Sequence, residues 1–128
     1  MKEYTSPGEV QLAPDANLTR ALWQHERESP DRAALSYRAG GQFVDVTSKQ
    51  FADKVRSIAA GLIELGVQKG DRVAVMSPTR IEWTYLDYAI WAAGAVTVPM
   101  YETSSAEQVE WIMSDSDAVV AFFGGTAH

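Results

Sequence analysis

Cysteine is absent from this 128-residue sequence, and histidine is scarce. The absence of cysteine excludes disulfides, thiolate nucleophiles and Cys-based zinc sites. Two histidines, His25 and His128, are too few for a His-rich metal centre. Neither has a nearby glycine-flanked serine of the kind that marks a Ser–His–Asp hydrolase. We expect His25 to be a solvated helix residue and His128 to belong to an unordered chain end.

Long apolar runs and clustered positive charge are also missing. No run approaches the roughly 20 apolar residues that a membrane-spanning helix needs, and residues 1–10 lack the apolar region of a signal peptide. We therefore expect a cytoplasmic protein without a transmembrane segment, with peripheral membrane contact as an alternative. Eleven basic residues, which are scattered, stand against seventeen acidic residues, giving a net charge of −6. This balance excludes nucleic acid as a partner.

The hydrophobic content, 46%, is that of a globular chain. A domain of this length buries roughly two-thirds of the surface that its unfolded chain exposes. Residues 1–16 are polar and interrupted by Pro7, Gly8 and Pro14, which predicts a loose N-terminal arm. We expect residues 17–128 to form one folded unit.

The first half of that unit predicts a helix and a hairpin. Asn17 is a suitable N-cap for a helix over 18–29. Two alternating apolar segments, 33–38 and 42–47, flank 39-AGG-41. Glycines supply the positive φ angles of a tight turn, so these segments predict a β-hairpin.

An amphipathic helix is predicted next. Thr47 and Gln50 have the spacing of a capping box, in which each side chain bonds the other residue's backbone N–H. Gly66 is placed to end the helix in the left-handed conformation. Between them, apolar residues recur at helical spacing; these are Phe51, Val55, Ile58, Ala59, Leu62 and Ile63.

The second half alternates strands and helices. Short β-branched strands at 72–77, 95–99 and 118–123 are separated by helices at 80–93 and 105–114. This alternation predicts parallel pairing in a βαβαβ unit. The predicted fold class is α/β: a layered sheet, covered on both faces because its strands are apolar on both faces, with a hairpin in front.

The loop 102-ETSS-105 invites a ligand hypothesis because it follows a strand, and ligands bind outside the carboxyl ends of parallel strands. Local structure explains the loop equally well. Pro99 cannot donate to a strand ladder and is predicted to end the strand. Ser105 with Gln108, or alternatively Ser104 with Glu107, has capping-box spacing.

The helix 80–94 carries two tryptophans and two tyrosines. It could line an aromatic ligand pocket, but large aromatic residues mostly serve burial, so we expect core or inter-subdomain packing. Asp115 and Asp117 could bind a hard cation through oxygen. We favour the interpretation that both are loop residues, which stop a helix by bonding their own backbone.

Two further patterns have local explanations. Glu107 and Glu110 lie near the start of the last helix, where the helix dipole favours acidic residues. The glycines in 122-FFGGTAH-128 superficially resemble a phosphate loop. However, the chain contains neither G-x-G-x-x-G nor G-x-x-x-x-G-K-[ST].

Three segments together resemble the amino-terminal part of the adenylate-forming (AMP-binding) acyl-CoA synthetases. They are 46-VTSKQFADKVRSIAAGLIELGVQKGDRVAV-75, 77-SPTRIEWTYLDYAIWAAGAVTVPMYETSSAEQVEWIM-113 and 115-DSDAVVAFFG-124. Their order and spacing extend the resemblance over residues 17–124. The form VPMYETSS is most similar to the bacterial long-chain fatty-acid–CoA ligases. The resemblance implies that 17–128 is part of the large N-terminal domain of the adenylate-forming fold.

The resemblance also implies a reaction. A fatty acid carboxylate attacks the α-phosphate of ATP with Mg²⁺ to give an acyl-adenylate, and coenzyme A then forms the thioester. The family's phosphate loop, [ST]-[ST]-G-x-[ST]-G-x-P-K, is absent from this chain. We therefore predict no catalytic, cofactor-binding or metal-binding residue here. The chain is expected to be an inactive scaffold from a longer enzyme whose reactive parts lie beyond His128.

Several alternatives remain open. An aryl-CoA ligase, an acyl-AMP ligase and a peptide-synthetase adenylation domain would share these opening motifs. A stand-alone α/β interaction module without chemistry is the alternative from another class. A phospho-receiver domain is disfavoured because the strands 72–77, 95–99 and 118–123 do not end in an aspartate. We also expect self-association, because the aromatic helix and the edge strands would expose apolar surface.

Overall fold

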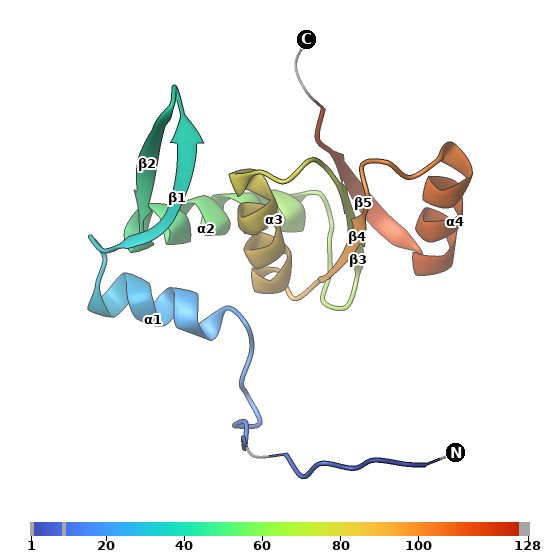
Figure 1. The fold of residues 1–128 in the computed structure, drawn as a ribbon, viewed down its shortest axis with the longest axis horizontal. Helices are drawn as coiled ribbons and strands as arrows, with labels where there is room; N and C mark the ends of the chain where they lie inside the picture. Colours follow the sequence, from blue (N-terminus) through green and yellow to red (C-terminus); the bar gives the residue numbers. More distant parts are fainter. Residues whose placement is uncertain (1, 9, 126–128) are drawn as a thin grey trace.

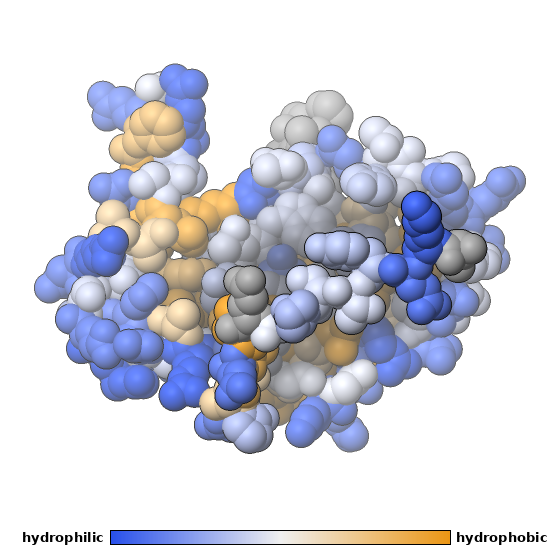
Figure 2. Space-filling view, turned by 60° about the horizontal axis from the view of Figure 1, so that its bottom comes forward, coloured by the Kyte–Doolittle hydropathy of each residue, from blue (hydrophilic) through white to orange (hydrophobic). Residues whose placement is uncertain are grey.

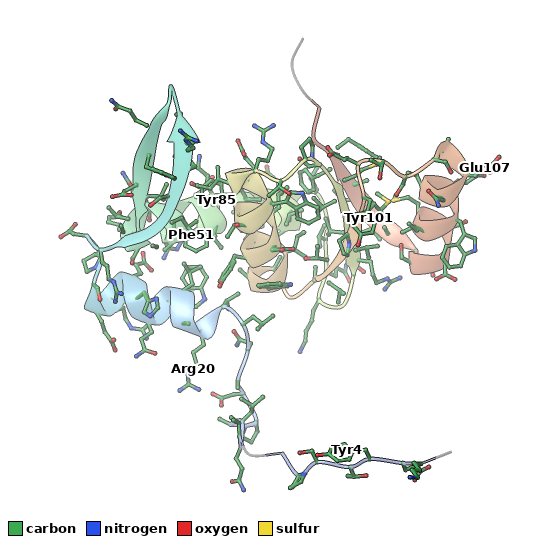
Figure 3. The ribbon with its side chains drawn as sticks, viewed as in Figure 1. Tyr4, Arg20, Phe51, Tyr85, Tyr101 and Glu107 are labelled. Carbon is green, nitrogen blue, oxygen red and sulfur yellow. The ribbon has the colours of Figure 1, made fainter. Side chains whose placement is uncertain are left out.

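The computed structural model describes residues 2–8 and 10–125 (Figure 1). Within them, residues 2–8 and 10–16 form neither helix nor strand. Tyr4 lies out along this segment, away from the rest of the chain (Figure 3). The helices and strands, in order, are α1 Arg20–Glu28, β1 Ala33–Ala39, β2 Gln42–Thr47, α2 Ser48–Glu64, β3 Arg72–Met76, α3 Ile81–Ala92, β4 Val96–Met100, α4 Ala106–Ser116 and β5 Ala118–Phe123.

The predicted hairpin is confirmed. Strands β1 and β2 pair antiparallel, and Gly40 and Gly41 have positive φ angles of 57° and 82°. The hairpin projects from the body of the molecule (Figure 1), and apolar side chains lie on its surface (Figure 2). Phe43 on β2 is exposed. The start of the preceding helix was predicted wrongly. Asn17 Oδ1 accepts bonds from the N–H and hydroxyl of Thr19, forming a turn, so α1 begins only at Arg20.

Helix α2 has the predicted ends. Both bonds of the capping box between Thr47 and Gln50 are present. At the other end Gly66 has φ 93°, its N–H bonds the Ile63 carbonyl, and the next N–H, of Val67, bonds the Leu62 carbonyl. This pair of bonds is a Schellman motif, and it turns the chain toward β3.

The parallel sheet is confirmed, with strand order β4-β3-β5. The central strand β3 is the most buried, and its residues Val73–Val75 are fully covered. The prediction that Pro99 ends its strand is wrong. Pro99 lies inside β4 opposite Val75, and the strand continues to Met100. Proline is tolerated there because β4 is an edge strand of the described sheet. No strand pairs with its outer side, so the missing N–H of Pro99 interrupts no strand pairing there.

Helix α3 confirms core packing for the aromatic segment. The ring of Phe51 on α2 lies 5.8 Å from that of Tyr85 and 5.0 Å from that of Tyr88 (Figure 3). Residues 83–93 are all partly or fully buried. The aromatic helix is therefore not the exposed apolar surface that we expected to drive self-association.

Only one of the two predicted caps is formed at the start of helix α4. Ser105 and Gln108 form both bonds of the capping box. The helix runs two residues further than predicted, so Asp115 lies within it, and Asp117 follows with a left-handed φ of 50°. The last residue of α4 is hydrogen-bonded to β3, because Arg72 Nε donates to the Ser116 carbonyl at 2.6 Å.

The layers follow from this order. Helices α2 and α3 lie on one side of the sheet and α4 on the other (Figure 1). The expectation that both faces are covered holds for β3 but not for the outer strands. Val96 on β4 is 50% exposed, and Val119 and Phe123 on β5 are 54% and 64% exposed. One helix on the second face is too little to cover three strands.

Candidate ligand pocket at the strand ends

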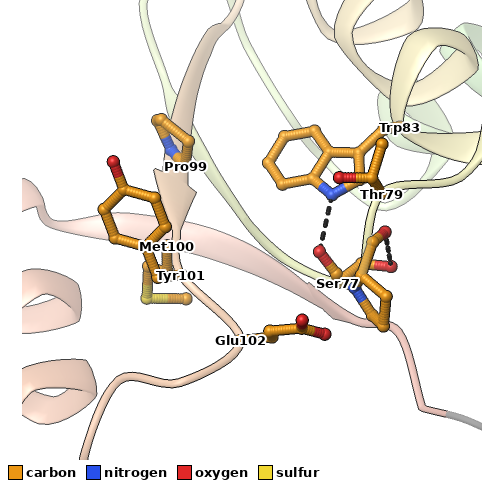
Figure 4. A pocket seen from close by; sticks show the side chains of 8 residues that line it. Ser77, Thr79, Trp83, Pro99, Met100, Tyr101 and Glu102 are labelled. Atoms are coloured by element: carbon orange, nitrogen blue, oxygen red, sulfur yellow. Dashed lines mark hydrogen bonds between the residues drawn. The ribbon is translucent and has the colours of Figure 1, made fainter.

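A pocket of about 350 Å³ lies where β3 and β4 end at their carboxyl edge. Figure 4 shows Ser77 and Trp83 on one side and Pro99, Met100 and Tyr101 on the other. Parallel strands bring these loops together because their carboxyl ends meet at the same edge of the sheet. Sequence reasoning explained the loop after β4 without a ligand. In the structure this loop nevertheless borders a cavity.

The β3 side of the pocket is held by two hydrogen bonds. The indole Nε1–H of Trp83, from the first turn of α3, donates to the Ser77 carbonyl at 2.8 Å. The hydroxyl of Ser77 donates to the Pro78 carbonyl at 3.1 Å. The indole is thus fixed edge-on to the loop that it borders, and its ring becomes an apolar wall.

The β4 side combines apolar surface with one carboxylate. Met100 is buried, whereas Tyr101 is 85% exposed and Glu102 is also exposed. Among the described residues that line the pocket, none is Lys, Arg or His. A phosphate or a carboxylate would meet Glu102 without a compensating cation, so the pocket suits an apolar or aromatic group better than an anion.

The point where the strand order reverses lies between β3 and β5, since the chain passes from β4 across β3 to β5. In open α/β sheets that reversal opens a ligand crevice. Here it is closed by backbone: the Gly124 N–H bonds the Met76 carbonyl at 2.7 Å. A Cβ on Gly124 would lie 2.5 Å from the Ser77 Cβ. The pocket bordered by Trp83 and Met100 therefore lies on the β4 side of β3.

The sequence-based candidates are dispersed rather than gathered at this pocket. His25 is exposed on α1, beside a separate cavity of about 280 Å³ near Leu22 and Phe51. His128 lies outside the described residues. In residues 2–8 and 10–125, no three His, Asp or Glu side chains cluster as a metal site would require. Asp115 and Asp117 therefore gain no support as cation ligands.

The remaining patterns also have structural explanations. Glu107 occupies the first turn of α4, as the dipole argument predicted, and points away from the body of the molecule (Figure 3). Gly124 and Gly125 are not among the glycines with positive φ. The phosphate-loop interpretation of 122–128 therefore finds no support in 122–125, and 126–128 lie outside the described residues.

Perturbed pKa values occur away from the pocket lining. A hydrogen bond from Arg80 at 2.7 Å lowers the pKa of Glu82, and one from Lys49 at 2.6 Å lowers the pKa of Asp53. Burial raises the pKa of Tyr85. Glu82 and Asp53 are exposed ion-pair members and Tyr85 packs on the core, so none has the setting of a catalytic acid or base.

Comparison with known proteins identifies the family. A family model described as "AMP-binding enzyme" matches residues 22–127. The chain belongs to this family. Its α/β fold is that of the N-terminal domain of adenylate-forming enzymes, as predicted: it superposes on a Mycobacterium tuberculosis fatty acyl CoA synthetase with a TM-score of 0.73 and 35% identity. That match covers 81% of this chain and 20% of the other.

This chain covers different shares of two curated relatives. It is 47% identical over all 128 residues to the long-chain-fatty-acid–CoA ligase FadD15 of M. tuberculosis, of which it covers 21%. It is 37% identical over 91 residues to the uncharacterized M. tuberculosis protein Rv1549, covering 71% of this chain and 51% of that protein. The chain thus spans about a fifth of FadD15 and about half of Rv1549.

Among the described residues, no helix is long and apolar enough to cross a membrane.

Proposed function

We propose that this chain is the amino-terminal portion of an ATP-dependent long-chain fatty-acid–CoA ligase. Such an enzyme converts a fatty acid and ATP to an acyl-adenylate and pyrophosphate, and then transfers the acyl group to coenzyme A with release of AMP. The observation that supports this proposal is the 47% identity to FadD15 over the whole chain. A cytoplasmic location belongs to the same proposal.

Within that enzyme we propose a scaffold role for residues 17–128, with residues 1–16 as an arm outside the folded unit. The strand-end pocket does not fit ATP with Mg²⁺, because it carries a carboxylate without a cation. The described residues contain no cluster of three His, Asp or Glu side chains that could hold the metal. Fatty acid, ATP, Mg²⁺ and coenzyme A would therefore be held by other parts of the ligase, and no catalytic residue is assigned here.

A chimera tests both parts of the proposal. Residues 1–128 would replace the aligned segment of FadD15, and pyrophosphate release would be measured with palmitate, ATP, Mg²⁺ and coenzyme A. We expect the chimera to keep activity within about tenfold of FadD15, because the exchanged segments are 47% identical. A tenfold change in rate corresponds to about 1.4 kcal/mol in the barrier. We expect residues 1–128 alone to release none.

Two results would contradict the proposal. Pyrophosphate release by residues 1–128 alone would show that the chain is more than a scaffold. A chimera that is folded by circular dichroism but inactive on palmitate would show that this α/β unit does not serve a long-chain ligase.

A stand-alone interaction module is the second candidate. The relative Rv1549 favours it, since the matched segment makes up 51% of that protein and so occurs in a much shorter setting than FadD15. This candidate predicts that residues 1–128 fold cooperatively alone while the chimera is inactive. The ligase proposal predicts an active chimera, so one assay separates the two.

A further inference from the structure

Helix α1 lies on the outside of the molecule (Figure 1) and is joined to it through few buried side chains. Among its nine described residues, only Leu22 is buried, whereas α2 buries six residues. The side chain of its N-cap residue, Thr19, makes no capping hydrogen bond. An isolated helix shorter than about 12 residues is marginal in water. Helix α1 therefore depends on its contact with the rest of the fold and would lose its helical structure if that contact opened.

Cavities border α1 on both sides of its contact with α2. The cavity of about 280 Å³ reaches Phe51 on α2 and Tyr88 on α3. A second cavity, of about 520 Å³, reaches Ala59 and Ile63 on α2. They border different faces of the helix, since the first is lined by Ala21, Leu22 and His25 and the second by Trp23, Glu26 and Arg27. Side chains that border a void lack contact partners there, so the packing of α1 on α2 is reduced to a narrow strip.

One guanidinium group joins the two helices along this strip. Arg56 Nη2 on α2 donates to both carboxylate oxygens of Glu26 on α1, at 3.0 and 2.8 Å. The same guanidinium lies 5.3 Å from the centre of the Trp23 ring. It is held from within α2 by Asp53, whose Oδ1 accepts from Arg56 Nη1 at 2.9 Å. Hydrogen bonds between charged groups are stronger than neutral ones, so Arg56 contributes a large part of the attachment of α1.

The chain is fixed to α2 again directly after α1. The Pro30 carbonyl accepts from the Lys49 N–H at 3.0 Å, and the Arg32 carbonyl accepts from the Ser48 N–H at 2.9 Å. Both donors belong to the first turn of α2, where an N–H has no partner within the helix. The arm that precedes α1 forms neither helix nor strand in its described part. Helix α1 is thus anchored at one end, and Ser29 connects it to that anchor.

We propose that α1 is a lid that opens as one unit while the rest of the molecule stays folded. The lid turns about Ser29, and the bonds from Arg56 to Glu26 are its latch. Opening uncovers the rings of Phe51 and Tyr88, which line the cavity of about 280 Å³. A segment that few apolar contacts hold is the kind that opens locally at low free energy. This inference concerns the chain as given and does not depend on the ligase reaction.

Native-state hydrogen exchange of residues 1–128 at low urea concentrations tests the proposal. The amides of α1 should be protected about tenfold less, or weaker still, than those of β3, because α1 opens without global unfolding. They should share one urea dependence that is smaller than that of β3, since this slope scales with the surface exposed. Exchange at α1 without any urea dependence would indicate fraying, and equal slopes at α1 and β3 would mean that α1 opens only with the whole molecule. Either result would overturn the proposal.

Three substitutions separate the latch from global stability. Glu26→Gln removes the charge that Arg56 bonds and should raise exchange at α1 by about three- to tenfold. Glu28→Gln is the matched control, because Glu28 bonds only Gln24 of the same helix among the described residues, and it should change that exchange by less than about twofold. Ser105→Ala weakens the cap of α4, so it should raise exchange at β3 and leave α1 unchanged. Equal effects of the two glutamine variants at α1, or of Ser105→Ala at α1 and β3, would overturn the proposal.

Discussion

Single residues decide how the ends of the strands fit together. At Gly124 the chain leaves β5 and crosses close to the end of β3, where its N–H bonds the Met76 carbonyl. The backbone of Gly124 lies so near Ser77 that a Cβ would be 2.5 Å from the Ser77 Cβ and would also meet the Ser77 hydroxyl. Around the next residue, Gly125, no atom lies within 4 Å of such a Cβ. Position 124 therefore has no room for a Cβ, whereas position 125 does.

Substitution of these glycines should separate the two cases. Gly124→Ala forces β5 away from β3 and should lower the free energy of unfolding by about 1–3 kcal/mol, as overpacking does. Gly125→Ala should change it by no more than about 0.5 kcal/mol. Adding Ser77→Gly to Gly124→Ala should restore part of the loss. Urea denaturation followed by tryptophan fluorescence measures all three, and equal effects of the two alanines would contradict the crowding argument.

Two threonines should respond oppositely to the same substitution. Among the described residues, the hydroxyl of Thr97 is buried without a protein hydrogen-bond partner. The hydroxyl of Thr47 caps α2. Thr97→Val removes an unpaired polar group and should stabilise the fold by about 1 kcal/mol. Thr47→Val removes a cap and should destabilise it by about 1 kcal/mol. Thermal unfolding checks both, and destabilisation by Thr97→Val would show that its hydroxyl has a partner.

Helices and strands were predictable where a local rule determines them. The capping boxes at Thr47 and Ser105 and the left-handed Gly66 were read from spacing, because each motif is completed within a few residues of sequence. The parallel pairing of the strands followed from their alternation with helices. The wrong start of α1 reflects a local bond between Thr19 and Asn17, whereas two other errors arose from contacts distant in sequence. Proline in β4 is allowed because of its position at the sheet edge, and the extra length of α4 accompanies the bond from Arg72, 44 residues earlier.

The candidate pocket was less predictable than the elements around it. Sequence reasoning explained the loop after β4 by its cap and its proline. The cap at Ser105 is confirmed, whereas Pro99 lies inside β4. The wall formed by Trp83 depends on an indole bond to the Ser77 carbonyl across the β3–α3 connection. The other wall, including Met100, comes from the next strand. Proximity of these two segments is a property of the folded sheet.

The cap of α4 gives an element-scale prediction with a built-in control. Ser105→Ala removes the hydroxyl that accepts from the Gln108 N–H and should cost about 1 kcal/mol of stability. Ser104→Ala, one residue earlier, should cost less than about 0.5 kcal/mol, since the alternative box with Glu107 is not formed. Amide exchange in the first turn of α4 should rise only for Ser105→Ala. The reverse pattern would mean that the helix starts one residue earlier.

At the scale of the whole molecule, acidic residues outnumber basic ones. The chain carries −6 at pH 7, and the sequence pI is about 4.8. A net charge far from zero destabilises the compact state through repulsion between its like charges. The free energy of unfolding should therefore depend on ionic strength.

Added salt should raise the free energy of unfolding of residues 1–128. The Debye length falls from about 30 Å at 0.01 M to about 8 Å at 0.15 M ionic strength, which screens the repulsion between the acidic residues. Urea denaturation at the two ionic strengths measures the change. A fold that is weakened by salt would instead depend on its surface ion pairs, such as Arg56 with Glu26.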